Sequence, residues 1–386
     1  KNAQLQLFDY EGYEKCNHIR SYRPAPIVRM EYVEEAAKLI NEAKRPFVIF
    51  GQGVILGKAE KEFKAFIEKA GIPAAWTIMG MSAIPTDHPL SVGMLGMHGN
   101  YGPNLLTNEC DVLIAVGMRF DDRVTGRLDK YAKQAKVIHL DIDPSEIDKN
   151  VKTTVPVWGD CKETLPMLTK LLEHKVYPQW IQKFADCIAK EQEKVIKQEL
   201  NPDSETLTMG EVIELVNELT KGDAIIVTDV GQHQMVACRY AKYNQTKSNV
   251  TSGGLGTMGF ALPAAIGAKF ARPDRDVIVI CGDGSFQMGL NELATIAGNQ
   301  LGIKIIIMKN ARLGMVRELQ DKHYGGRHSA TILNGDPDFL KIADAYGIDH
   351  AEAHSNKEAE NIIKGIVDSE KPFILVCDVH PDTPSI

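Results

Sequence analysis

A carboxylate and an amide side chain each follow an apolar run, at a spacing that suits a shared divalent cation. Asp283 follows residues 277–281 within a Gly-Asp-Gly triplet, and Asn310 follows residues 303–308, 27 positions after Asp283. Runs this rich in β-branched residues are typical of buried parallel strands, and ligands collect where such strands end. Mg²⁺ takes oxygen ligands and usually bridges a phosphate. The pattern therefore predicts a cradle for a metal-bound diphosphate.

Two further loops favour this site over a plain turn, which is a common use of Asp and Gly after a strand. Residues 229–234 follow the apolar run 224–227, and a glycine-rich segment comes next at 252–259. Glycine lets a backbone approach a ligand closely. The three segments together favour a binding site.

The elements that must position these loops alternate between helix and strand. The patterns predict helices at 31–43, 59–69, 178–200 and 209–220 and strands at 46–50, 111–116, 136–141, 224–227, 277–281 and 303–308. Such alternation is typical of doubly wound parallel sheets. We therefore expect an α/β chain with a linker (1–25), a first domain (26–165), a helical connector (166–205) and a second domain (206–386).

Composition limits the class of protein. With 386 residues, 44% hydrophobic and 25% charged, the chain suits two globular domains. Its net charge of −7 argues against nucleic-acid partners and anionic membranes. The most apolar stretch, 255–270, is broken by Gly and Pro and is too short to cross a bilayer. Seven cysteines without a C-x-x-C motif predict reduced thiols and a cytoplasmic location.

The three loops resemble, in this order, the diphosphate-binding domain of thiamine diphosphate enzymes. That signature is Gly-Asp-Gly, a spacer in the mid-twenties and Asn, and the spacer here holds 25 residues, 285–309. Segments 230–234, 254–259 and 313–316 are most similar to the large subunit of acetohydroxyacid (acetolactate) synthases, and the resemblance runs from about residue 25 to the end. It implies decarboxylation of pyruvate and carboligation to a second 2-oxo acid. The products would be 2-acetolactate, or 2-aceto-2-hydroxybutyrate from 2-oxobutyrate, in branched-chain amino-acid biosynthesis.

The resemblance also assigns residues to thiamine diphosphate and Mg²⁺. Met258 would hold the cofactor bent, with Gln232 and Leu319 as the other catalytic positions, and the metal would take Asp283, Asn310 and the carbonyl of Arg312. The cofactor-binding residues implied are Val230, Gly231, Gln232, His233, Gly256, Met258, Gly282, Asp283, Gly284, Ser285, Asn310, Gly314, Met315 and Val316. Two alternatives stay open: a Met258 that only packs in its turn, and a His233 that acts as acid or base.

A flavin site is implied in the first domain, which would be a central FAD-binding-like domain. Segments 95–99 and 117–126 are similar to the flavin-binding loops of acetohydroxyacid synthases. The residues implied are Gly51, Gly53, Thr77, Met79, His98, Gly99, Gly117, Arg119, Asp121, Arg123, Asp141, Ile142 and Asp160. The alternatives are a structural turn at 51–53, an exposed ion-pair ribbon at 119–123 and a His98 that hydrogen-bonds a carbonyl. FAD would be structural, because the reaction has no net redox step.

The chain departs from the family in three places. Lys309-Asn310 stands where two asparagines are usual, and Leu319 stands where many members have a Trp that shapes the acceptor pocket. The activating Glu of the family, in an amino-terminal pyrimidine-binding domain of a neighbouring subunit, matches no segment. Glu292 is better explained as part of the helix after Gly-Asp-Gly. We therefore expect a fragment with little synthase activity of its own.

The resemblance implies a homodimer or homotetramer and a possible small regulatory subunit. Two other functions are open. One is another FAD-containing thiamine diphosphate enzyme, such as pyruvate oxidase or glyoxylate carboligase. The other is a non-catalytic assembly module.

Overall fold

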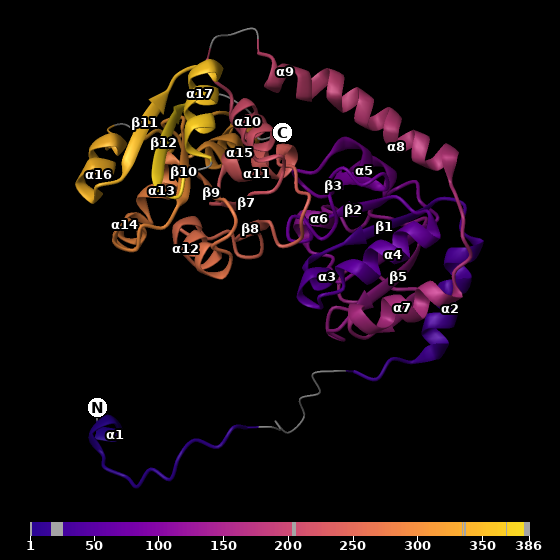
Figure 1. Cartoon of the computed structure of the whole chain (residues 1–386). Helices are drawn as coiled ribbons and strands as arrows, with labels where there is room; N and C mark the ends of the chain where they lie inside the picture. The colour runs from indigo at the N-terminus through magenta and orange to yellow at the C-terminus, as the bar shows by residue number, and fades with distance from the viewer. Residues whose placement is uncertain are drawn as a thin grey trace.

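The predicted α/β class is confirmed by two sheets that are parallel throughout. The computed structural model describes residues 2–16, 26–202, 206–333, 335, 337–367 and 369–381. Within these residues there are two six-stranded sheets, which lie side by side in Figure 1. Residues 1 and 17–25 of the predicted linker and 203–205 of the predicted connector lie outside the described residues. A short helix that the sequence did not predict, α1 (Asn2–Leu5), lies in the described part of the predicted linker.

The first sheet has the strand order β3-β2-β1-β4-β5-β6. Its strands are β1 (Pro46–Phe50), β2 (Ala74–Trp76), β3 (Ser91–Met94), β4 (Val112–Val116), β5 (Lys136–Asp141) and β6 (Val155–Trp158). Its helices are α2 (Met30–Glu42), α3 (Gln52–Leu56), α4 (Glu60–Ala70), α5 (Tyr101–Leu106), α6 (Asp122–Thr125) and α7 (Cys161–Leu171). The chain reverses its direction of winding between β1 and β4, which is where ligands bind in such sheets.

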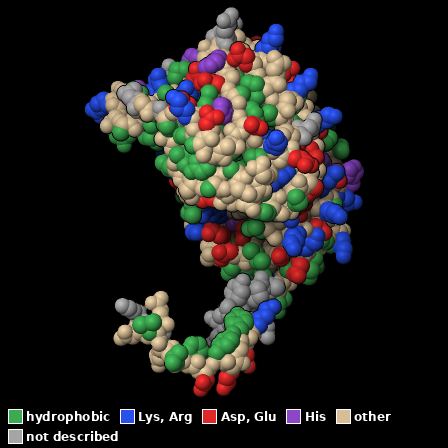
Figure 2. All heavy atoms as spheres, turned by 60° about the vertical axis from the view of Figure 1, so that its left-hand side comes forward, with side chains coloured by type: hydrophobic (Ala, Val, Ile, Leu, Met, Phe, Trp, Pro, Cys, Tyr) green, Lys and Arg blue, Asp and Glu red, His purple; other side chains and the backbone are tan. Residues whose placement is uncertain are grey.

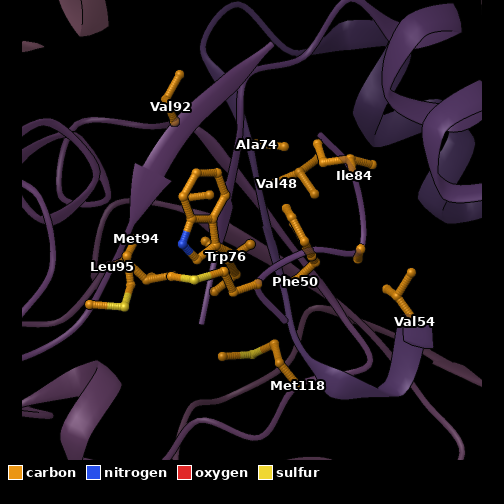
Figure 3. Packing of buried hydrophobic residues seen from close by; sticks show 14 of the residues in the cluster. Val48, Phe50, Val54, Ala74, Trp76, Ile84, Val92, Met94, Leu95 and Met118 are labelled. Atoms are coloured by element: carbon orange, nitrogen blue, oxygen red, sulfur yellow. The ribbon is translucent and has the colours of Figure 1, made fainter. Parts of the chain in front are cut away.

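Apolar packing under β1 and β2 forms the core of this unit. Figure 3 shows Phe50, Trp76 and Met118 among the buried side chains there. The ring of Phe50 lies 4.4 Å from that of Phe63 on α4. Helix α4 ends where Gly71 takes a left-handed conformation with φ 65°, which glycine adopts without strain. Apolar contacts such as the pair of Phe50 and Phe63 rings therefore hold α4 against β1.

A long helical segment joins the two sheets, as expected for residues 178–200. It comprises α8 (Pro178–Glu191), a π-helical turn η1 (Gln192–Ile196) and α9 (Lys197–Leu200), and it runs past both units in Figure 1. Glu191 accepts from Asn100 Nδ2 at 3.2 Å and Tyr101 N at 3.1 Å, and pairs with Arg239. This buried carboxylate ties the connector to elements from both sheets.

The second sheet has the strand order β11-β12-β10-β9-β7-β8. Its strands are β7 (Ile225–Thr228), β8 (Asn249–Thr251), β9 (Val277–Gly282), β10 (Ile303–Lys309), β11 (Asp349–Ala353) and β12 (Phe373–Asp378). Its helices are α10 (Met209–Thr220), α11 (Gln232–Tyr240), α12 (Ala261–Ala271), α13 (Asp283–Gln287), the 3₁₀ turn η2 (Leu290–Glu292), α14 (Leu293–Gly298), α15 (Gly314–Tyr324), α16 (Phe339–Tyr346) and α17 (Asn356–Ile366).

Most predicted elements are confirmed to within a residue or two, and one is wrong. Helix α10 begins and ends as predicted, because Thr208 and Glu211 form a capping box and Lys221 adopts a left-handed conformation. Glu292 does not continue the helix after Gly-Asp-Gly. That helix ends at Gln287, and Gly289 separates it from the 3₁₀ turn that holds Glu292. The domain boundaries at residues 165 and 205 stay predictions.

The surface and the cysteines agree with the composition. On the face shown in Figure 2, basic and acidic side chains are interspersed. No helix among the described residues combines the length and apolarity needed to cross a membrane. Six cysteines are buried, and Cys16 is exposed.

Candidate functional site

The loops singled out in the second half of the chain meet at one edge of the second sheet. Strand β7 pairs with β8 on one side and with β9 on the other, so the winding reverses between β7 and β9. Residues 229–233 follow β7, and residues 283–285 follow β9, which ends at Gly282. Asn310 follows β10, which pairs with β9. In sheets of this type the crevice at the reversal binds the ligand.

Asp283 and Asn310 are neighbours at this edge. Asp283 Oδ2 accepts from Asn310 N at 3.1 Å and from Ala311 N at 2.6 Å, and Oδ1 accepts from Gly284 N at 2.8 Å. Only 1% of Asp283 and 7% of Asn310 is exposed. Three backbone donors thus fix the carboxylate of Asp283 against the backbone of Asn310 and its neighbours.

The amide of Asn310 belongs to a chain of side-chain hydrogen bonds. Its Nδ2 donates to Gln232 Oε1 at 3.1 Å, and Gln232 Nε2 donates to Glu318 Oε1 at 2.6 Å. Asn310 Oδ1 accepts from Arg312 N at 3.2 Å. The side chain of Gln232 crosses Gly314, where a Cβ would lie 1.6 Å from Gln232 Oε1. Gly314 is therefore needed for the position of Gln232.

These side chains fit the predicted Mg²⁺ site. No three His, Cys, Asp or Glu side chains gather into a metal site within the described part of the chain. The predicted donor set is instead one carboxylate with amide and carbonyl oxygens. Such a set suits a hard cation that keeps phosphate oxygens among its ligands. At Gly284 a Cβ would lie 2.8 Å from Leu313 Cδ2, so a larger residue would displace the Leu313 side chain.

Asp229 has a structural role at this site that the sequence patterns did not reveal. Its Oδ1 accepts from Val230 N at 2.8 Å and from Gly259 N at 3.0 Å, and its Oδ2 accepts from Ala261 N at 3.0 Å. It is 2% exposed. Asp229 thus joins the loop after β7 to the glycine-rich segment that carries Met258. In the sequence, the position of Asp229 directly after a predicted strand was the signal that could have indicated this role.

His233 is a neutral ring in the wall of the site. Complete burial lowers its pKa to about 4, although the nearby Asp229 carboxylate and a hydrogen bond to the Asp229 backbone favour the charged form. Its Nε2 is buried without a hydrogen-bond partner among the described residues. A Cβ at Gly282 would lie 2.9 Å from His233 Nδ1. The ring therefore packs directly under the Gly-Asp-Gly loop.

The remaining residues of this set line the outer part of the edge. Met258 is half-buried in a turn, while Val316 and Leu319 on α15 are 46% and 52% exposed. Gly256 and Met315 lie on the same two segments as Met258 and Val316. Gly231 is the N-cap of α11, and Ser285 lies in the first turn of α13, where its Oγ accepts from Gly282 N at 3.1 Å.

The residues implied for flavin also gather at one edge, the carboxyl ends of the first sheet. Each strand from β1 to β6 is followed by at least one of them: Gly51 and Gly53 after β1, Thr77 and Met79 after β2, His98 and Gly99 after β3, Gly117, Arg119, Asp121 and Arg123 after β4, Asp141 and Ile142 at the end of β5, and Asp160 after β6. This convergence was not visible in the sequence spacing, which separates Gly51 from Asp160 by over a hundred residues.

Several of these residues have structural partners. Gly51 N donates to Val116 O at 3.0 Å, and Gly53 N donates to Gly117 O at 2.8 Å. These backbone hydrogen bonds join the loops after β1 and β4, which agrees with the alternative that residues 51–53 form a structural turn. Asp121 caps α6 and lies 3.4 Å from Arg119 Nε, and Asp160 caps α7.

His98 and Asp141 differ from these helix caps. Neither ring nitrogen of His98 has a hydrogen-bond partner in the described structure, so the alternative that it satisfies a carbonyl is wrong. Burial lowers the pKa of His98 and raises the pKa of Asp141. Buried side chains of this kind are typical of binding sites.

Comparison with known proteins gives two family matches. The profile described as thiamine pyrophosphate enzyme, central domain, matches residues 33–168, and the profile described as the C-terminal TPP binding domain of these enzymes matches residues 229–377. Both regions contain most of the sheet described for that part of the chain. Each profile also covers one of the two strand edges described above.

Individual relatives carry more specific names. The acetolactate synthase large subunit of Lactococcus lactis is 41% identical over 90% of this chain and 60% of its own length. The isozyme 3 large subunit of Escherichia coli K12 is 40% identical over 85% of this chain and 58% of its own. The probable acetolactate synthase large subunit of Methanocaldococcus jannaschii is 40% identical over 93% and 62%. The chain thus spans about 60% of the length of these curated relatives.

Proposed function

Since the chain belongs to the thiamine pyrophosphate enzymes and is homologous to acetolactate synthase large subunits, we propose that it is part of an acetolactate synthase. The whole protein would decarboxylate pyruvate and join the product to a second 2-oxo acid, pyruvate or 2-oxobutyrate. Residues 206–386 would form the thiamine diphosphate unit and residues 26–165 the flavin unit. Because the relatives are named large subunits, a smaller regulatory subunit is the partner we expect, with a cytoplasmic homodimer or homotetramer as the catalytic assembly.

The observation that supports this function best is the contact between the carboxylate of Asp283 and the backbone of Asn310 at the reversal of the second sheet. Asp283 and Asn310 would bind Mg²⁺ together with the carbonyl of Arg312. Val230 to His233 and Gly282 to Ser285 would surround the diphosphate, and Gly314 to Val316 would flank the pyrimidine. Bound thiamine diphosphate supplies a carbon nucleophile and an electron sink for decarboxylation. Met258 would orient the cofactor, and the buried His233 would exclude water.

The direct test is stabilisation by the cofactors. We expect thiamine diphosphate with Mg²⁺, at about 100 times the dissociation constant, to raise the melting temperature of the 386-residue chain by roughly 5–10 °C. Differential scanning calorimetry with Mg²⁺ alone, with thiamine diphosphate alone and with both measures this. Because the metal bridges protein and phosphate, only the pair should give the full shift. An unchanged melting temperature with both would contradict the proposal.

FAD is the cofactor that we propose for the first sheet, because His98 and Asp141 offer buried polar atoms at the carboxyl edge. Arg119 and Arg123 would meet its phosphates. The flavin would be structural. Carboligation by the whole protein should then survive chemical reduction of the flavin.

Leu319 is the residue that we expect to set the acceptor. It is exposed on α15, the helix that follows the Asn310 loop in the sequence, and has no large aromatic surface to cover an acceptor's extra methylene. In the whole protein, Leu319→Trp should raise the preference for 2-oxobutyrate over pyruvate by about 10-fold or more. A competition assay with both acceptors measures the product ratio. Leu171→Trp, at a similarly exposed position on α7, is the control and should leave the ratio unchanged.

A further inference from the structure

Glu318 lies outside the predicted metal site but is connected to it. The carboxylate accepts from Gln232 Nε2 at 2.6 Å, and Gln232 Oε1 accepts from Asn310 Nδ2 at 3.1 Å. Two amide groups thus stand in series between a carboxylate on α15 and the predicted metal ligand after β10. No sequence pattern connects these three positions, which come from three separate segments.

The orientation of the two amides in this series of hydrogen bonds follows from the chemistry of the groups at its two ends. An amide side chain can be turned by 180° and exchange its donor and acceptor, whereas a carboxylate only accepts. Beside Glu318, Gln232 must therefore present its nitrogen to the carboxylate and its oxygen to Asn310. Asn310 must then turn its nitrogen to Gln232, which leaves its oxygen for other partners. With Gln232 reversed, Asn310 would present its nitrogen where the cation needs an oxygen.

The position of Gln232 leaves little room for another arrangement. The side chain lies over Gly314, where any Cβ would collide with Gln232 Oε1, and Gln232 is 6% exposed. The other contact of Asn310 has the same polarity, because Asn310 Oδ1 accepts from Arg312 N. The contacts of Asn310 with Gln232 and with Arg312 N therefore favour the same orientation of its side-chain amide.

We propose that Glu318 is a positioning residue for the Mg²⁺ site: through Gln232 it turns the amide oxygen of Asn310 toward the cation. Glu318 touches neither metal nor cofactor in this account. The inference rests on the proposed Mg²⁺ site. Residues that orient metal ligands from outside the ligand set typically change metal affinity 10- to 100-fold when replaced.

Two substitutions of similar shape separate this role from a general effect of charge. Glu318→Gln removes the charge but keeps a side-chain oxygen that can accept from Gln232. Glu318→Met removes both. We expect Glu318→Met to weaken Mg²⁺ binding about 10-fold and Glu318→Gln to stay within about threefold of the parent chain. The measurement is the Mg²⁺ dependence of thiamine diphosphate binding by isothermal titration calorimetry. A melting curve without Mg²⁺ checks that each variant folds.

A second measurement depends only on orientation. Asn310→Asp places an oxygen toward the cation whichever way the side chain is turned. In that background Glu318→Met should cause no further loss of Mg²⁺ affinity, whereas independent effects would add.

The outcomes are distinct. Equal losses in Glu318→Gln and Glu318→Met, no loss in either, or an additive double substitution would overturn the positioning role while leaving the proposed function intact. A parent chain without Mg²⁺-dependent thiamine diphosphate binding would instead overturn the proposed function, and the role of Glu318 with it.

Discussion

Asp283→Asn should weaken the Mg²⁺-dependent binding of thiamine diphosphate by about 100-fold, or about 2.7 kcal/mol. The substitution replaces an anionic oxygen ligand by a neutral amide of the same shape. It also removes one of the two acceptors that now receive the amides of Gly284, Asn310 and Ala311. Titration of the chain with Mg²⁺ at fixed thiamine diphosphate, followed by calorimetry, gives the affinity of both forms.

Glu292→Gln is the matched control for Asp283. It removes the same charge from the same segment, but Glu292 lies in the 3₁₀ turn and accepts from its neighbour Asn291 at 2.8 Å. It should bind both ligands as the parent does. If Asp283→Asn retained full Mg²⁺-dependent binding, the metal site would have to lie elsewhere.

Asp229→Ala is expected to lower the free energy of unfolding by about 3–5 kcal/mol, because three N–H groups, one buried and two partly buried, lose their shared acceptor. These are the amides of Val230, Gly259 and Ala261. The glycine-rich segment would also lose its attachment to the loop after β7, so thiamine diphosphate binding should fall as well. Urea denaturation measures the stability, and calorimetry measures the binding.

Two other substitutions serve as comparisons for Asp229→Ala. Asp229→Asn keeps one acceptor oxygen and should lose roughly half as much stability. Asp274→Ala removes an exposed carboxylate that pairs with Arg272, and it should leave the urea midpoint unchanged. An Asp229→Ala chain as stable as the parent would show that the three donors find other acceptors.

The strands and most helices were predictable because their causes are local. Buried parallel strands read as continuous apolar runs, as in β4, β9 and β10. Lys304, a charged residue inside β10, can be buried because its Nζ donates to the carbonyls of Ser369 and Lys371, and burial lowers its pKa to about 8. Caps such as Thr208 set helix ends through residues three positions away. The prediction for Glu292 was wrong because α13 ends at Gln287 and Gly289 separates it from the 3₁₀ turn that holds Glu292.

The proximity of Asp283 and Asn310 was predictable for a related reason. Loops that follow adjacent parallel strands must meet at one edge, so Asp283 and Asn310 had to lie close together once both strands were recognised. The chemistry of carboxylate and amide oxygens then indicated the cation.

Only the tertiary structure decided how the side chains are oriented. The sequence determined two parallel sheets and the meeting of Asp283 with Asn310, because strand periodicity and strand-end position are properties of short segments. It did not reveal that Asp229 joins two loops, that Glu318 orients Gln232, or that Glu191 joins both sheets to the connector. Each of these contacts links residues at least 30 positions apart. Such contacts depend on how whole elements pack, and no local pattern encodes them.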